Sequence, residues 1–119
     1  MLIFYGFDIQ LYVEQILVRD SGPRLCYARD CTAQQWLIVK VAEDSDLLAW
    51  LCVPVSERAM RAVEEGRATS RDAAQHSATG VVELVVVDHG RAVPDSCILC
   101  ADIPEELLPA ADFSVLSAA

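Results

Sequence analysis

Residues 36–66 read WLIVKVAEDSDLLAWLCVPVSERAMRAVEEG, and this stretch decides the fold. The mainly apolar segments 35–41 and 47–55 flank a short polar turn. This pattern predicts two antiparallel strands, each apolar on both faces and therefore central in a sheet. A helix follows at once, since Ser56 is a favourable N-cap residue and Gly66 suits the left-handed conformation that ends helices. We expect the rest of the chain to pack around this unit.

Further strands are predicted on both sides of this unit, over residues 9–18, 24–29, 81–88 and 92–100. The apolar alternation of the first changes phase at Glu14-Gln15, which indicates a bulge, and Pro94 interrupts the last. Short helical turns are expected at 70–76, with Ser70 as the cap, and at 104–108.

The sequence therefore predicts an α+β fold in a single domain over residues 1–119. A bent, mostly antiparallel sheet of five to six strands should carry one main helix packed on it. The tail from about residue 110 is expected to be frayed.

The chain is strongly acidic, with 18 acidic residues against nine basic ones and a net charge of −9. Because affinity for nucleic acid comes from neutralising phosphates, this balance predicts no direct nucleic-acid binding. No apolar run approaches the roughly 20 residues that span a bilayer, and the first residues lack the basic region of a secretory signal. We therefore expect a cytoplasmic protein without membrane contact, whose acidity serves solubility or a basic partner surface.

Three local patterns occur in order along the chain: WLCVPVS at 50–56 with Arg58 and Gly66 after it, SRDA at 70–73, and IPEELLP at 103–109. Together they resemble the DUF6575 family of small bacterial domains of unknown function, over roughly residues 8–113. The resemblance implies a bacterial, cytoplasmic, stand-alone domain. The family has no established catalytic residues to carry over to this chain.

An odd number of cysteines without a signal segment argues against a disulfide framework. The five are Cys26, Cys31, Cys52, Cys97 and Cys100. Cys97 and Cys100 have CxxC spacing, but residues three apart in a strand point to opposite faces. Zinc held by these two with Cys26 and Cys31, or a redox pair, are the alternatives. We expect mainly buried apolar thiols and no cofactor.

The titratable side chains show no known catalytic pattern. His76 and His89 lie in predicted loops. Although Asp88 precedes His89, adjacent side chains in a turn are expected to diverge, and catalysis would also need a nucleophile. No motif of a serine hydrolase, zinc protease or phosphate-binding loop occurs. The sequence therefore predicts a protein that is not an enzyme. A small enzyme or ligand-binding domain with a site in the concave face of the sheet is an alternative.

Two sets of side chains are candidates for partner binding. Four of the nine basic residues lie close together in the chain, at Arg58, Arg61, Arg67 and Arg71. They predict a basic ridge for an acidic partner or a phosphate, or else a solvated helix face balanced by glutamates. The aromatic residues Tyr5, Phe7, Tyr12, Trp50 and Phe113 are expected to leave a patch for a partner or for self-association. From both sets we select Arg58, Arg61, Arg67, Arg71, Trp50 and Tyr12 as partner-binding residues.

The first functional hypothesis is a non-enzymatic protein-interaction module, an accessory or regulatory subunit of a bacterial cytoplasmic assembly. The second is an acidic antitoxin or immunity-type protein whose carboxylates mask a basic site on a toxin or nuclease. The net charge fits the second hypothesis, but the acidic residues are dispersed along the chain.

Overall fold

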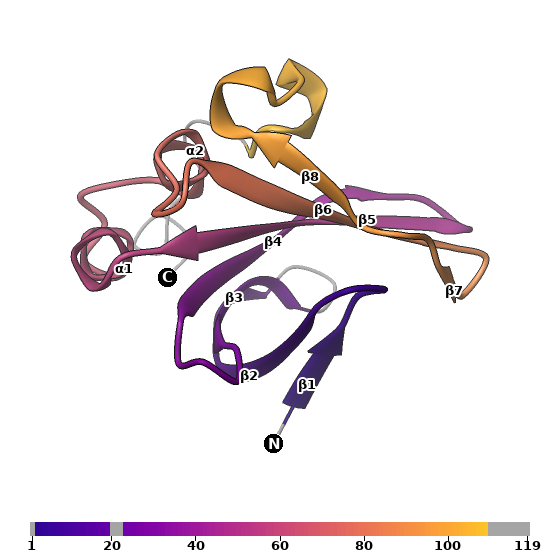
Figure 1. Ribbon diagram of the computed structural model, residues 1–119, viewed down its shortest axis with the longest axis horizontal. Coiled ribbons are helices and arrows are strands. Elements are labelled where there is room, and N and C mark those ends of the chain that lie inside the picture. Colours follow the sequence, from indigo (N-terminus) through magenta and orange to yellow (C-terminus); the bar gives the residue numbers. More distant parts are fainter. Residues whose placement is uncertain (1, 20–22, 110–119) are drawn as a thin grey trace.

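The computed structural model describes residues 2–19 and 23–109 (Figure 1). Its main element is a curled antiparallel sheet, and the strands are β1 (Leu2–Tyr5), β2 (Gln10–Arg19), β3 (Pro23–Arg29), β4 (Gln35–Glu43), β5 (Leu47–Val55), β6 (Val81–Asp88), β7 (Arg91–Ala92) and β8 (Ser96–Leu99). Strands β1 to β6 are neighbours in the order of the chain. Both β7 and β8 pair with β6, as two parts of one edge that is interrupted around Pro94, as predicted.

The sheet curls so far that strands distant in its order meet on the inner face. Leu11 of β2 and Val85 of β6 belong to one buried cluster, which also contains Cys26, Ile38 and Cys52. In Figure 1 the β1–β2 hairpin accordingly lies below β5 and β6. The result is a half-barrel with an apolar interior, and a second apolar cluster forms on the outer face.

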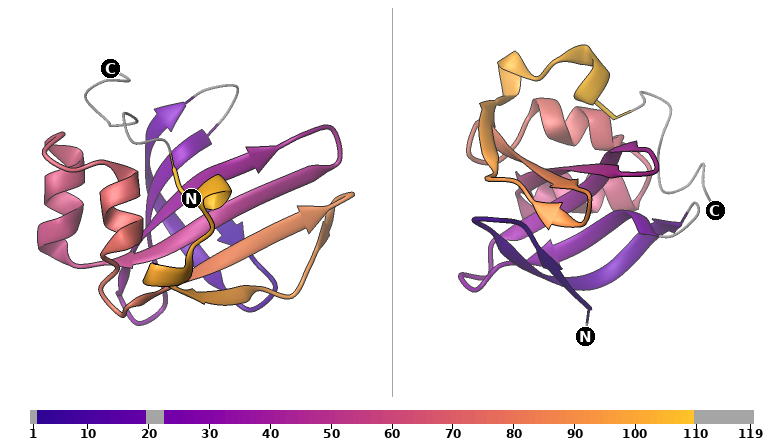
Figure 2. Two further views of the ribbon diagram at one scale, coloured as in Figure 1. Left: turned by 90° about the horizontal axis from the view of Figure 1, so that it is seen from above. Right: turned by 90° about the vertical axis from the view of Figure 1, so that its right-hand side faces the viewer.

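The outer cluster lies between the sheet and two helices, α1 (Glu57–Glu64) and α2 (Ser70–Gln75). Leu51, Val53 and Val55 of β5 point into it, and Met60 and Val63 of α1 complete it. Figure 2 shows the two helices side by side at one end of the sheet. Because β4 and β5 are buried on both faces, the predicted central pair is confirmed.

Strand β2 contains two bulges. Val13 and Gln15 pair with consecutive residues of β3, and so do Ile16 and Val18, so one residue of β2 is unpaired at each bulge. The predicted change of phase at Glu14 is therefore a bulge. The second bulge sends Ile16 to the inner cluster and Val18 to the outer one, although the sequence pattern placed both on one face. Each bulge adds local twist and bends the strand.

The termini of α1 follow their predicted chemistry. Ser56 Oγ accepts a hydrogen bond from the N–H of Ala59 at 3.1 Å. Gly66 has a φ of +75°, and its N–H and that of Arg67 donate to the carbonyls of Val63 and Ala62 at 3.1 and 2.8 Å. This is the Schellman arrangement, which satisfies carbonyls that the end of a helix leaves free.

Three fold predictions need correction. The described residues hold eight strands rather than five or six, because the predictions omitted β1 and joined β7 with β8. They hold two α-helices rather than one main helix, although α2 lies at the short helical turn predicted at 70–76. The cap of α2 is Thr69, which forms a capping box with Asp72, whereas Ser70 is buried inside the helix.

Two 3₁₀ helices, η1 (Cys100–Asp102) and η2 (Glu105–Leu107), end the described chain, and η2 is the helical turn predicted at 104–108. The tail from residue 110, with Phe113, lies outside the described residues. Within the described part, no helix is long and apolar enough to cross a membrane.

Candidate interaction surfaces

The outer side of the β1–β2 hairpin carries a group of large side chains that no helix covers. Ile3 is paired with Tyr12, and Tyr5 with Gln10, so all four point to the same side of the sheet. We call this group, Ile3, Tyr5, Gln10 and Tyr12, the tyrosine face. Tyr5 is 62% exposed, and the amide of Gln10 donates to the Tyr12 hydroxyl at 3.1 Å.

The tyrosine face continues the side of the sheet that the helices cover elsewhere. Tyr12 is paired with Arg29 of β3, and Tyr27, two residues before Arg29, belongs to the cluster beneath α1 and α2. Arg29 Nε lies 3.2 Å from Glu14 Oε1, an ion pair without good hydrogen-bond alignment. The aromatic group is thus bordered by a pair of opposite charges, as an interface is bordered by a polar rim.

Trp50, although predicted beside Tyr12, lies on the opposite side of the sheet. Its ring meets the ring of Phe4 edge to face, with 5.6 Å between centroids, and Lys40 Nζ lies 5.3 Å from its centroid. Lys40 is only 8% exposed, and its ammonium group contacts Glu43 at 3.1 Å. Trp50 therefore packs inside the half-barrel and shields the buried charge of Lys40. Of the other predicted aromatic residues, Phe7 is exposed, at 59%, as Tyr5 is.

Three of the four predicted arginines gather on one surface. Arg58, Arg61 and Arg67 line a depression of about 310 Å³ next to α1. Arg61 pairs with Glu57 and Arg67 with Glu65, each at 3.2 Å. The side chain of Arg58 has no ion pair or hydrogen bond with another described residue. The alternative of a helix face balanced by glutamates thus describes most of this surface.

Arg71 does not belong to that surface. Its guanidinium group donates to both carboxylate oxygens of Glu105, at 2.7 and 2.8 Å, and to the carbonyl of Pro109 at 3.3 Å. The contacts join α2 to a segment more than 30 residues later. Nη2 bonds both oxygens of Glu105 while Nη1 bonds the Pro109 carbonyl, so the charge-assisted contacts of Arg71 hold the end of the described chain against α2.

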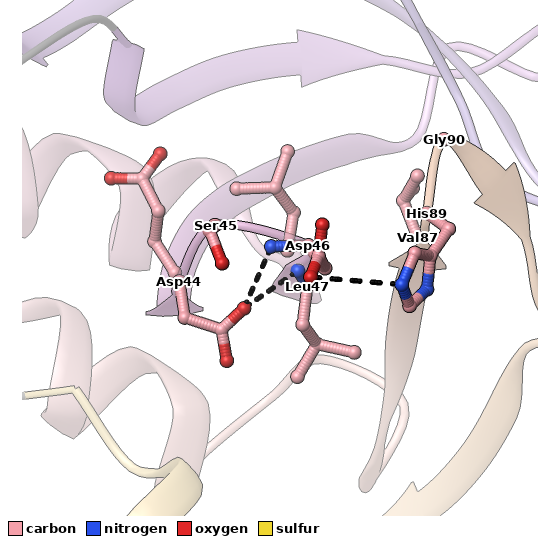
Figure 3. Close-up of a pocket in the computed structure, with 9 residues that line it drawn as sticks. Asp44, Ser45, Asp46, Leu47, Val87, His89 and Gly90 are labelled. Atoms are coloured by element: carbon pink, nitrogen blue, oxygen red, sulfur yellow. Dashed lines mark hydrogen bonds and ion pairs between the residues drawn. The ribbon is translucent and has the colours of Figure 1, made fainter.

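Carboxylates that are dispersed in sequence meet at the end of the molecule opposite the helices. The β4–β5 turn and the β6–β7 turn form an open depression of about 530 Å³, lined by Glu43, Asp44, Asp46 and His89 among others (Figure 3). Asp44 organises its own turn by accepting the N–H groups of Asp46 and Leu47 at 2.9 and 2.8 Å. We call Glu43, Asp44, Asp46 and Asp88 the acidic end.

His89 connects the two turns of the acidic end. Its Nδ1 lies 2.7 Å from a carboxylate oxygen of Asp88, so the expectation that these neighbours diverge is wrong. Its Nε2 lies 3.6 Å from Asp46, and its backbone N–H donates to the Asp46 carbonyl at 2.7 Å. The φ values of His89 and Gly90 are +51° and +76°, as a two-residue type I′ hairpin requires.

This arrangement lacks the parts of a nucleophilic site. Within the described chain, no hydroxyl or thiol is hydrogen-bonded to His89, whose ring nitrogens both face carboxylates. Its side chain is 71% exposed, so water competes for every contact. Among the same residues, no group of three or more His, Cys, Asp or Glu side chains is arranged to hold a metal ion.

The cysteines that could have shared a zinc ion lie apart. Cys26 is buried in the inner cluster, whereas Cys31 and Cys97 are exposed at different places. The Cys100 thiol, in η1, donates to the Ser77 hydroxyl at 3.1 Å, so the CxxC pair has no common face. Burial, then the charges of Asp95 and Glu83, raise the pKa of the Cys52 thiol, which is the condition of an unreactive thiol.

Sequence reasoning missed β1, and with it the partner that places Tyr12 in a continuous face. A possible signal was the apolar run at 2–5 followed by glycine, which resembles the first arm of a hairpin. Comparisons of this chain with models of protein families, with curated proteins and with solved structures found no match. The resemblance to the DUF6575 family therefore stays a prediction.

Proposed function

We propose that this protein is a non-enzymatic interaction module, an accessory or regulatory subunit of a bacterial cytoplasmic assembly, and that it binds its protein partner through the tyrosine face. The observation that carries the proposal is the position of Ile3, Tyr5 and Tyr12. They lie on the side of the sheet that is covered by helices elsewhere, yet Tyr5 remains 62% exposed. Exposed apolar side chains that adjoin one another favour an interaction site.

The side chains of the tyrosine face suit an interface. Tyrosine offers a large contact area at a low cost in conformational entropy, and it is enriched among residues that dominate binding energy. The ion pair of Arg29 and Glu14 at the border can exclude water from the aromatic centre. The hairpin is also a stiff support, because backbone groups in its turn are hydrogen-bonded to the other end of the sheet.

The test is affinity capture from the source bacterium with matched variants. Tyr5→Ala should weaken capture of the partner by about tenfold or more, as expected when an anchor worth roughly 2 kcal/mol is truncated. Leu99→Ala is the control, because Leu99 is 58% exposed but lies on β8, away from the tyrosine face. Equal capture by both variants would contradict the use of this face.

One observation favours the antitoxin or immunity-type alternative. The fold gathers Glu43, Asp44 and Asp46 around one depression, with Asp88 next to it. In that function, the acidic end would cover a basic active site, and binding would weaken steeply with salt. The double substitution Asp44→Asn with Asp46→Asn should then abolish capture, whereas Glu64→Gln on α1 should not. Salt-insensitive capture that depends on Tyr5 favours the first function instead.

A further inference from the structure

The outer edge of β1 presents backbone groups that have no neighbour strand in the described chain. The N–H of Gly6 donates to the carbonyl of Ile9, which makes Gly6 and Ile9 a hydrogen-bonded pair. Such pairs alternate along an antiparallel ladder, so Phe4 and Leu2 are also bonded to β2. The N–H and C=O groups of Ile3 and Tyr5 therefore point away from β2, toward the free edge.

This edge lacks the devices that usually protect sheet edges, which are charges, proline and bulges. Residues 2–7, LIFYGF, carry no charge, although the chain as a whole has a net charge of −9. The opposite edge is different, since β7 and β8 are two short pieces separated around Pro94. Of the two edges in the described residues, β1 is thus the uninterrupted one.

We propose that a second copy of this chain pairs antiparallel with β1, so that two sheets join around a twofold axis. The outward groups of Ile3 face those of Tyr5 in the partner copy, and the same pair recurs on the other side of the axis. Phe4 then lies opposite its own counterpart, and the backbone forms four hydrogen bonds between the copies. The pairing is self-complementary and closes as a dimer.

A second copy fits this edge because the edge is uncharged and matches itself: the residues with outward groups, Ile3 and Tyr5, lie symmetrically about Phe4. Two molecules with a net charge of −9 repel each other over most approaches, and residues 2–7 offer a contact without opposed charges. In the joined sheet, Tyr5 of one copy lies beside Ile3 of the other. One edge of the Tyr5 ring then packs against Ile3, and the two tyrosine faces form one continuous surface that stays open to a partner.

Two substitutions at one position separate the backbone contact from the side-chain contact. Tyr5→Pro removes the outward N–H but no bond to β2, and proline is tolerated at such edge positions. Tyr5→Ala removes the same ring and keeps the N–H. We expect wild type and Tyr5→Ala to reach twice the monomer mass of 13.0 kDa in light scattering at up to about 1 mM, and Tyr5→Pro to remain monomeric.

Hydrogen exchange provides a test that needs no variant. The amides of Ile3 and Tyr5 should exchange about tenfold more slowly once the concentration favours the dimer, while the amides of β8 should not change. Added salt should strengthen the dimer, because it screens the repulsion of two acidic molecules. A monomeric wild type at about 1 mM, or a dimer that persists in a folded Tyr5→Pro variant, would overturn the proposal. Neither result depends on capture of a foreign partner.

Discussion

The carboxylate of Asp95 accepts a hydrogen bond from the backbone N–H of Phe7 at 3.0 Å, across 88 positions of sequence. Its second oxygen accepts the N–H of Asp8 at 2.9 Å. These bonds join the turn of the β1–β2 hairpin to the connection between β7 and β8. Among the described residues, the Asp95 carboxylate thus bonds the two sides of the half-barrel's opening directly, while the first and last strands are not paired with each other.

Asp95→Asn should destabilise the protein by about 1 kcal/mol, because the amide keeps one acceptor oxygen and leaves one backbone N–H without its charged partner. Urea unfolding measures the difference. Asp102→Asn serves as the control, since Asp102 is exposed and its side chain makes no comparable hydrogen bond with another described residue. If both variants unfold at the same urea concentration as wild type, the Asp95 contact contributes no stability.

Gly6→Ala should also disturb this closure. A Cβ atom at Gly6 would lie 2.7 Å from Ile9 Cγ2, 2.8 Å from Asp95 Oδ2 and 3.0 Å from Val85 Cγ2. Relief of these contacts must move the hairpin turn or the carboxylate, at a cost of roughly 1–3 kcal/mol.

Gly80→Ala is a useful comparison for that variant. No atom lies within 4 Å of a Cβ there, but the φ of +82° makes alanine strained by about 1–2 kcal/mol. Thermal unfolding should show a loss for both variants. The protection of the Phe7 and Asp8 amides from hydrogen exchange should be lost in Gly6→Ala alone. Equal protection of these amides in both variants would contradict the steric argument.

Glu83 should make the protein less stable as pH rises. Burial, followed by the charges of Asp95 and Asp8, raises the pKa of Glu83 above its ordinary 4.5. The folded state therefore holds this proton more tightly than the unfolded state, so stability falls as pH rises from 4.5 through the raised pKa. Glu83→Gln should be more stable than wild type at pH 7, by about 0.5 kcal/mol after solvent screening, and this gain should vanish below pH 4. Urea unfolding at several pH values measures it, with the exposed Glu106→Gln as a variant that should show no such trend.

Substitution by lysine should lower the stability of the protein at Arg71 but not at Arg58. Arg71→Lys keeps the charge, but its single nitrogen cannot replace both Nη2, which bonds Glu105, and Nη1, which bonds the Pro109 carbonyl. We therefore expect a stability loss of about 1 kcal/mol and faster hydrogen exchange over η2. Arg58→Lys should leave both unchanged, since Arg58 is exposed on α1. Unchanged exchange of η2 in Arg71→Lys would show that the contacts of the two guanidinium nitrogens do not hold this segment.

The cysteines should divide by burial when the folded protein is treated with a thiol reagent. Cys31 and Cys97 are exposed and should be labelled quickly, whereas Cys26 and Cys52 should react only after unfolding. Burial raises the pKa of Cys26 and Cys52, so both lack the reactive thiolate at neutral pH. Peptide mass spectrometry identifies the labelled positions, and early modification of Cys52 would contradict its placement in the half-barrel.

Local chemistry allowed much of the fold to be predicted. The caps Ser56 and Gly66 act within a few residues of α1, and β5 and β6 span the predicted segments 47–55 and 81–88. The sequence did not reveal β1 as a strand, because a run of four apolar residues has no period and is defined by its pairing with β2. It also assigned the cap of α2 to Ser70, since both Thr69 and Ser70 are suitable cap residues.

The candidate surfaces were less accessible to sequence reasoning. The aromatic residues Tyr5, Tyr12 and Trp50 look equivalent in the sequence, yet the pleat and the curl send Trp50 inward and the two tyrosines outward. The arginines are near one another in the chain, yet Glu105 withdraws Arg71 from the others.

What the sequence by itself determined was the set of elements whose causes are local: two central strands, a capped helix and a bulge at Glu14. Only the tertiary structure decided that the sheet curls until Asp95 reaches the turn at Phe7, and that dispersed carboxylates share the acidic end. The physical reason is range. Capping, turn geometry and strand period act over a few residues, whereas the curl accumulates from twist and bulges over the whole sheet.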